Sequence, residues 1–164
     1  MRKSIIVIIG FIGAAVAADI PHRKPGLWEM TSRSAPVSRL ICLDRETEDL
    51  LNRQAVASGQ EACSEVAIRS TGNQLIARAV CKVGSVTMTS EATTTFTSDT
   101  ASTTQIHTTF APPTSGRSRD TQDDAKWLGA CPADMKPGDM ILQTGGSHPH
   151  QMRTSVREMF KQPQ

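Results

Sequence analysis

The chain has 164 residues, of which 18 are Lys or Arg and 16 are Asp or Glu, so its formal net charge is +2. This length allows one domain, and the near balance of charge excludes the basic excess of a typical nucleic-acid-binding domain. Hydrophobic residues make up 38% of the chain and aromatic residues 4%, which excludes a multi-span membrane protein.

Residues 1–18 have the three parts of a secretory signal peptide. Arg2 and Lys3 are basic, a short apolar run follows, and small residues precede two candidate cleavage points, after Ala17 and after Ala18. The apolar run is shorter than the ~20 residues that span a bilayer, so we expect cleavage rather than an uncleaved membrane anchor. The sequence therefore predicts a periplasmic or secreted protein with no membrane span after cleavage. Its mature chain has 16 basic and 16 acidic residues.

The mature part holds four cysteines, Cys42, Cys63, Cys81 and Cys131. Exported proteins meet an oxidising compartment, where an even number of cysteines favours disulfides. The close Cys-x-x-Cys spacing typical of a zinc site is absent. We therefore expect two disulfides.

Two strands and a helix are predicted first along the mature chain. Alternating apolar positions indicate a strand over residues 26–33 and a second over 37–42. Asp44 is a typical N-cap, acidic residues crowd the turn that follows, and Gly59 is the expected end. This predicts one amphipathic helix of about three turns.

Two hairpins follow, in which the hydrophobic period becomes two. Residues 63–82 turn at 71–73, and residues 84–110 turn at 98–99. Residues 87–109 contain eleven Thr, a β-branched residue that suits a half-exposed strand. A glycosylated, mucin-like stalk is the alternative, but it favours Pro among the Thr, and this stretch has none. The expected inward-facing residues are Val86, Met88, Phe96, Ile106 and Phe110.

A last strand is expected over residues 117–128, and the Gly- and Pro-rich chain from Gly129 onward is expected to be mostly irregular. The complete pattern predicts an α+β fold: a curved antiparallel sheet of six or seven strands with one helix and two disulfides. Residues 19–145 form the single exported domain, and residues 146–164 form a flexible tail with a short helix near 155–160. Because the tail has few large apolar residues, we expect its deletion to change stability little.

Hairpin geometry favours one pairing of the cysteines. If 71–73 is a three-residue loop, Cys63 lies opposite Cys81, within disulfide reach. Cys42 and Cys131 would then close a long loop. The rival pairing joins Cys42 to Cys63 at the two ends of the helix, and Cys81 to Cys131.

Several motifs together resemble a known family. They are Pro25-Gly26-Leu27-Trp28-Glu29, Cys42-Leu43-Asp44, the segment from Cys63 to Cys81, and the stretch from Lys126-Trp127-Leu128-Gly129-Ala130-Cys131-Pro132 to Met140. Over residues 25–145 the chain is similar to domain-of-unknown-function family 3617, small exported proteins, mainly from proteobacteria, with no established activity. The resemblance implies a compartment and a general architecture, and it transfers no catalytic residue.

The sharpest candidate for a metal site is His148-Pro149-His150-Gln151-Met152. Alternate imidazoles and a thioether suit copper, so His148, His150 and Met152 are candidate ligands. Two histidines are too few for a closed site, and no metal or other cofactor is therefore assigned.

Trp28 and Trp127 are the only two tryptophans. Core packing in a small β-domain is the ordinary role of such residues. The alternative is a platform for a ligand on an apolar sheet face.

Catalytic patterns are weak in this chain. The sequence has no Gly-x-Ser-x-Gly elbow, and Asp123 and Asp124 are adjacent, so on a strand they face opposite sides and cannot share a site. We therefore expect a non-catalytic binding or scaffolding module, with a small apolar ligand or an envelope protein as partner and no nucleic acid. The alternatives are a copper-handling protein and, less favoured, a hydrolase.

Overall fold

The computed structural model describes residues 21–113, 118–145 and 150–159, so the predicted signal peptide lies outside it. The described residues form nine strands and two helices. In chain order they are β1 (Gly26–Ser32), β2 (Val37–Leu43), α1 (Arg45–Ala62), β3 (Cys63–Thr71), β4 (Gln74–Val83), β5 (Val86–Ser98), β6 (Ala101–Ala111), β7 (Arg119–Gly129), β8 (Asp139–Thr144), β9 (His150–Ser155) and α2 (Val156–Met159). None of the described helices is long and apolar enough to cross a membrane.

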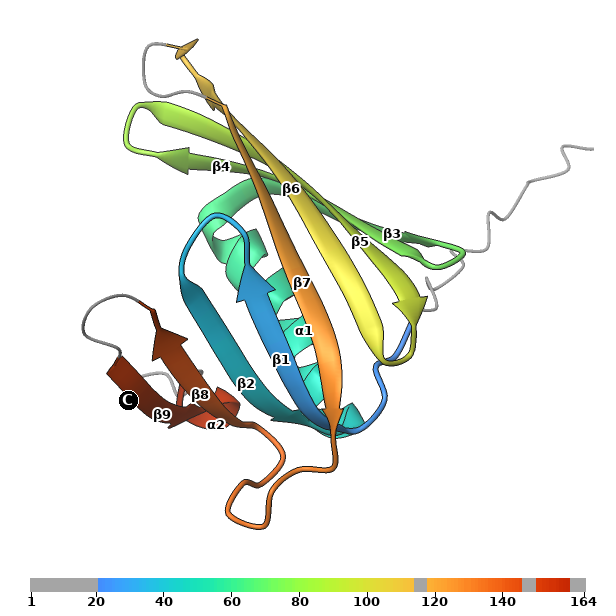
Figure 1. Cartoon of the computed structure of the whole chain (residues 1–164). Helices are drawn as coiled ribbons and strands as arrows, with labels where there is room; N and C mark the ends of the chain where they lie inside the picture. Colours follow the sequence, from blue (N-terminus) through green and yellow to red (C-terminus); the bar gives the residue numbers. More distant parts are fainter. Residues whose placement is uncertain (1–20, 114–117, 146–149, 160–164) are drawn as a thin grey trace, which may run out of the picture.

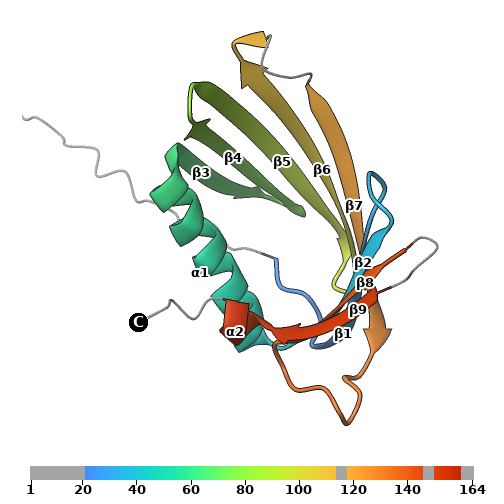
Figure 2. The same ribbon diagram turned by 90° about the vertical axis from the view of Figure 1, so that its left-hand side faces the viewer.

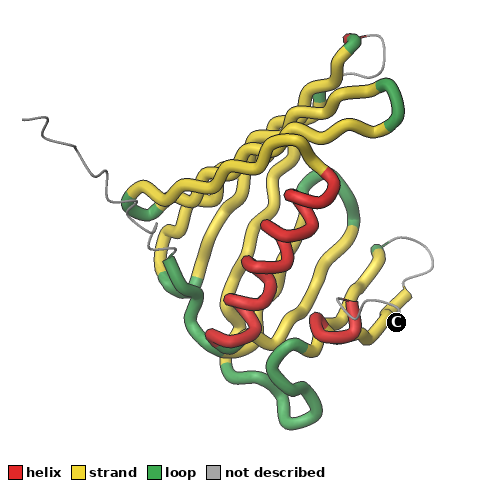
Figure 3. The backbone as a smooth tube through the Cα atoms, turned by 180° about the vertical axis from the view of Figure 1, so that it is seen from behind, coloured by secondary structure: helices red, strands yellow, loops and turns green. Residues whose placement is uncertain are grey.

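All nine strands belong to one antiparallel sheet, in the order β3-β4-β5-β6-β7-β1-β2-β8-β9 (Figure 1). Strands β3 to β7 form a meander. The N-terminal hairpin β1–β2 continues the sheet, because β1 pairs with the second edge of β7. Strand β8 then pairs with β2. The sheet curls strongly, and α1 lies across its concave side (Figure 2). Seen from behind, α1 crosses in front of the strands (Figure 3).

The sheet has nine strands, whereas the sequence pattern predicts six or seven. The additional strands are β8 and β9, which pair with each other along six positions. Both are short and lie in the Gly- and Pro-rich region where irregular chain is expected. Residues 150–159, expected in the flexible tail, instead form β9 and α2, and Val156 is fully buried. The prediction of a flexible tail is therefore wrong for β9, whereas the short helix expected near 155–160 is present as α2.

Helix α1 begins at the predicted cap. The backbone N–H of Thr47 donates a hydrogen bond of 2.8 Å to Asp44 Oδ1. Hydrogen bonds from Thr47 lower the pKa of the Asp44 carboxyl below its ordinary value. The helix continues through Gly59 to Ala62, so it is longer than predicted. A glycine inside a helix costs only about 1 kcal/mol, and the helix ends where Cys63 enters the sheet.

The disulfides are Cys42–Cys131 and Cys63–Cys81, the same pairs that hairpin geometry favours. The register behind the second pair differs from the prediction. Thr71 pairs directly with Gln74, so the turn has two residues instead of three, with Gly72 at φ 57°. A bulge between Cys63 and Glu65 shifts the register by one residue and brings Cys63 opposite Cys81.

The buried core lies at one end of the sheet. It consists of Trp28, Ile41, Leu43, Met140 and Val156, from β1, β2, β8 and α2. Leu50 and Leu51 of α1 pack against this cluster, which places it on the concave side. A second, smaller cluster of Cys42, Met135 and Ile141 lies on the opposite side of the sheet. The core therefore covers only part of the concave face.

Candidate functional site on the concave face of the sheet

The two tryptophans stabilise the segment that precedes β1. Trp28 is 0% exposed, and its indole N–H donates a hydrogen bond of 2.8 Å to the carbonyl of Lys24. Trp127 donates in the same way to the carbonyl of Pro25, and the Lys24 ammonium lies 4.0 Å from the Trp127 ring centroid. Because Trp28 has no exposed ring face, the ligand platform considered for it is not formed.

A buried ion pair fixes the same segment to α1. Glu48 is buried, and its carboxylate accepts hydrogen bonds from the backbone N–H of Arg23 at 3.1 Å and from Arg23 Nη1 at 3.2 Å. The Arg23 guanidinium carbon lies 5.8 Å from the Trp28 ring centroid and 5.6 Å from that of Phe96. This contact forms the boundary between the buried core and the rest of the concave face.

The strand register identifies the side chains that face α1. Trp28 pairs with Ile41 and Trp127, and the alternation of side chains then assigns every second residue of each strand to the concave side. Among the apolar residues that this places on the concave side of β3 to β6, we call nine the apolar patch: Val66, Ile68, Leu75, Ala77, Ala79, Met88, Ala92, Ile106 and Phe110. Cys81, Val83, Val86 and Phe96 share this side and are not counted in the patch. None of the nine is buried, and Ile68 is 39% exposed.

The predicted inward-facing residues of the second hairpin are only partly buried. Phe96 is buried beside the core, whereas Val86, Met88, Ile106 and Phe110 are all half-buried. Their direction agrees with the alternation, but the chain does not bury them. The reason is that α1 packs along β3 and β4 and against the core, and leaves the middle of the sheet without a second apolar layer.

The hydroxyl groups within this face bond to each other. Ser90 Oγ and Thr108 Oγ1 are 3.1 Å apart, and Thr94 Oγ1 and Thr104 Oγ1 are 2.9 Å apart. Each is a cross-strand pair, and the two pairs flank the Ala92–Ile106 pair. Each bond satisfies one hydroxyl donor of its pair, so these four residues are less polar toward this face than hydroxyls without any partner.

The convex face of the same strands is polar. Arg78, Glu91, His107 and Asp120 lie in one row across four strands. Arg78 Nε lies 3.5 Å from Glu91 Oε1, and His107 Nδ1 lies 2.6 Å from Asp120 Oδ1. This is an ordinary solvent-facing pattern, so the concave face is the unusual one.

A cavity of about 290 Å³ lies beside the core, on strands β1, β2, β7 and β8. Met30, Val37 and Leu142 supply apolar lining, and Arg39 and Asp123 supply one charge of each sign. Neither charged side chain forms a hydrogen bond or ion pair with another described residue. No motif in the sequence points to Arg39. The alternation that separates Asp123 from Asp124 already indicates that one of these aspartates faces inward.

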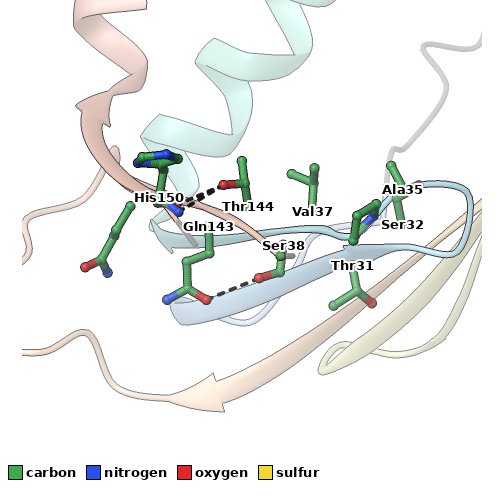
Figure 4. Close-up of a pocket in the computed structure, with 11 residues that line it drawn as sticks. Thr31, Ser32, Ala35, Val37, Ser38, Gln143, Thr144 and His150 are labelled. Atoms are coloured by element: carbon green, nitrogen blue, oxygen red, sulfur yellow. Dashed lines mark hydrogen bonds between the residues drawn. The ribbon is translucent and has the colours of Figure 1, made fainter. Parts of the chain in front are cut away.

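A larger groove of about 660 Å³ lies at the ends of the β1–β2 and β8–β9 hairpins (Figure 4). No Asp, Glu, Lys or Arg lines it, and two of its polar groups are bonded within the lining. Ser38 Oγ donates to Gln143 Oε1 at 3.2 Å, and Thr144 Oγ1 accepts from the His150 backbone N–H at 3.1 Å. These bonds occupy part of the polar lining, whose other side chains include Thr31, His150 and Gln151.

The candidate metal ligands are not brought together with further ligands. His150 and Met152 are exposed on β9, and His148 lies outside the described residues. Among the described residues, no three His, Cys, Asp or Glu side chains are grouped as a metal site would require. The copper-handling alternative has no support from this arrangement.

Comparison with protein families gives one match. Residues 23–131 match the family described as "Protein of unknown function (DUF3617)". The chain belongs to DUF3617. A search of the curated proteins and a search of the solved structures each found no match.

The DUF3617 match extends from Arg23 to Cys131. It includes the Arg23–Glu48 ion pair, both disulfides and every residue of the apolar patch. Strands β8 and β9 and helix α2 lie beyond it. Arg39 and Asp123 are inside the matched region, whereas Leu142, which completes the cavity lining, is outside it.

Proposed function

We propose that this protein is an exported binding protein without catalytic activity, and that its apolar patch holds the aliphatic chain of a lipid. The observation that carries the proposal is the incomplete burial of nine apolar side chains on the concave side of the sheet. A patch of this kind marks an interaction site more often than a monomer surface.

The shape and composition of the patch favour an aliphatic chain over other ligands. Its centre is made of Ala77, Ala79 and Ala92, whose side chains are small, and larger side chains surround them. Phe110 is the one aromatic residue in it, so a planar ligand has little to stack on. Burial of each methylene of a bound chain contributes about 0.8 kcal/mol.

Export is supported by the basic and apolar pattern of residues 1–18 and by the two disulfides. We expect the exported protein to begin at Ala18 or Asp19. N-terminal sequencing of the protein from the extracytoplasmic fraction checks this. Recovery of a chain that retains Met1 in the membrane fraction would show that the segment is an anchor.

Binding is tested by titrating the disulfide-bonded protein with a tritium-labelled long-chain fatty acid. The variant Ala92→Glu places a carboxylate at the centre of the patch, and we expect at least tenfold weaker binding, because an unpaired charge opposes contact with an aliphatic chain. Thr93→Glu puts the same charge on the convex face of the same strand, so its affinity should equal that of the wild type.

Near-UV circular dichroism shows whether each variant is folded. If Ala92→Glu does not fold, Ala92→Phe, which fills the space with an apolar ring, replaces it. Failure of the wild type to bind, or equal binding by the Ala92 and Thr93 variants, would contradict the proposed site.

A further inference from the structure

The cavity has one charged side chain on each side of strand β1, Arg39 on β2 and Asp123 on β7. Arg39 of β2 pairs with Met30 of β1, and Asp123 of β7 pairs with Ser32 of β1. Both side chains face the concave side, and their strands are about 10 Å apart because β1 lies between them. Met30 lies between the two charges as part of the cavity lining.

These charges have no partner within the described part of the chain, although oppositely charged groups lie in the same cavity. The neighbouring Asp124, in contrast, has hydrogen-bond partners. Asp124 accepts hydrogen bonds from Thr103 at 2.8 Å and from Arg33 at 2.9 Å on the convex face. These bonds lower the pKa of Asp124. Asp123 has no such partners and is half-buried.

Asp123 at the edge of the cavity lies on the same face of the sheet as the apolar patch. Asp123 pairs with Thr104 of β6, and the hydroxyl of Thr104 is bonded to Thr94. One step further along β6 is Ile106, on the same face and in the patch. A molecule with its polar end between the charges can therefore extend its chain along the patch.

We propose that this cavity is the headgroup site of the bound amphiphile, and that it selects a zwitterionic headgroup with a phosphate at Arg39 and a primary ammonium at Asp123. This inference rests on the proposed function. An arginine fork suits a phosphate, and a primary ammonium has three donors for Asp123 and the Ser32 hydroxyl. A quaternary ammonium is usually held by aromatic rings, and none lines this cavity.

The test compares three single-chain amphiphiles of equal chain length, each below its micelle concentration. They are a lysophosphatidylethanolamine, a fatty acid and a primary alkylamine, which are zwitterionic, anionic and cationic. The full-length exported protein should bind the zwitterion about tenfold more tightly than either of the others, since only it satisfies both charges.

Two single-residue variants should each weaken binding of the zwitterion, and they should differ in their effect on the other two amphiphiles. Arg39→Gln should weaken the zwitterion about tenfold and leave the alkylamine unchanged or tighter. Asp123→Asn should weaken both the zwitterion and the alkylamine about tenfold and leave the fatty acid unchanged or tighter. The control variants Lys126→Gln and Asp120→Asn remove one positive and one negative charge from exposed convex positions of β7. Each should bind the three amphiphiles in the same order of affinity as the wild type.

Each outcome decides a separate point. Equal binding of the three amphiphiles by the wild type, with binding still lost in Ala92→Glu, would overturn the headgroup site and leave the proposed function standing. Equal effects of Arg39→Gln and Asp123→Asn on all three would show that the two residues serve the fold, and would also overturn it. No binding of any amphiphile would overturn both.

Discussion

Replacing both Cys42 and Cys131 by alanine is expected to lower the free energy of unfolding more than replacing both Cys63 and Cys81. The two bridges close loops of very different length, with sequence separations of 89 and 18 residues. In the chain-entropy description these correspond to about 4.6 and about 3.2 kcal/mol. The long bridge should therefore contribute about 1.4 kcal/mol more to stability.

Packing adds to this difference. Leu27 of β1 pairs with Cys42 on one side and with Gly129 on the other, so the long bridge ties β2 to the end of β7 across β1. Cys42 is fully buried against Met135 and Ile141. Alanine is the appropriate replacement because a serine hydroxyl there would be buried without an assigned partner.

Denaturant unfolding of the two double variants, with the wild type as reference, measures the difference. The intact bridge in each variant is verified by mass spectrometry under non-reducing conditions. A Cys63/Cys81 variant that loses as much stability as the Cys42/Cys131 variant, or more, would contradict the expectation and show that the hairpin bridge is coupled to the packing of α1.

The local features of this fold follow from the sequence because they are set by neighbouring residues. The cap at Asp44 and the turn near Gly72 each depend on a few adjacent side chains. In the Thr-rich hairpin, the face of the sheet on which each side chain lies follows from the period of two. The number of residues in the turn does not follow, since a bulge near Cys63 compensates for the tighter loop and yields the same disulfide.

Features that depend on distant pairing were not accessible in this way. Strands β8 and β9 are only six residues each and lie among Gly and Pro, and they exist because β2 offers β8 an edge. The proximity of Arg39 and Asp123 requires β7 to pair with β1, a contact between strands separated by most of the chain. Alternation alone places each residue on a face but cannot say which strands are neighbours.

The sequence pattern also overestimates how much the sheet buries. Apolar alternation in β5 and β6 indicates a core face, yet Ile106 and Phe110 remain half-buried because no second layer covers them. Conversely, the alternation identifies Trp28 as an inward residue but cannot distinguish a ligand platform from the core. Trp28 is completely buried because Val156 of α2 and Met140 of β8 pack in the same cluster, and these contacts join distant parts of the chain.

Deleting residues 146–164 is expected to destabilise the protein strongly, contrary to the small effect that the sequence pattern predicts. The deletion removes β9, which pairs with every residue of β8, and it removes Val156. Val156 is 0% exposed and packs with Trp28 and Met140 in the core cluster. Loss of this strand and side chain should cost roughly 4–5 kcal/mol, a large share of the net stability of a small domain.

Point variants separate the buried contact from the loss of the strand. Val156→Ala removes two buried carbon atoms and should cost about 2 kcal/mol. Met152→Ala, in β9 itself, should change stability by less than about 0.5 kcal/mol, since Met152 is 57% exposed. Thermal unfolding of the truncated protein and both variants gives the comparison. A truncated protein that melts with the wild type would mean that Trp28 and Met140 are covered equally well without α2, and a large effect of Met152→Ala would place the essential contact on β9 instead of Val156.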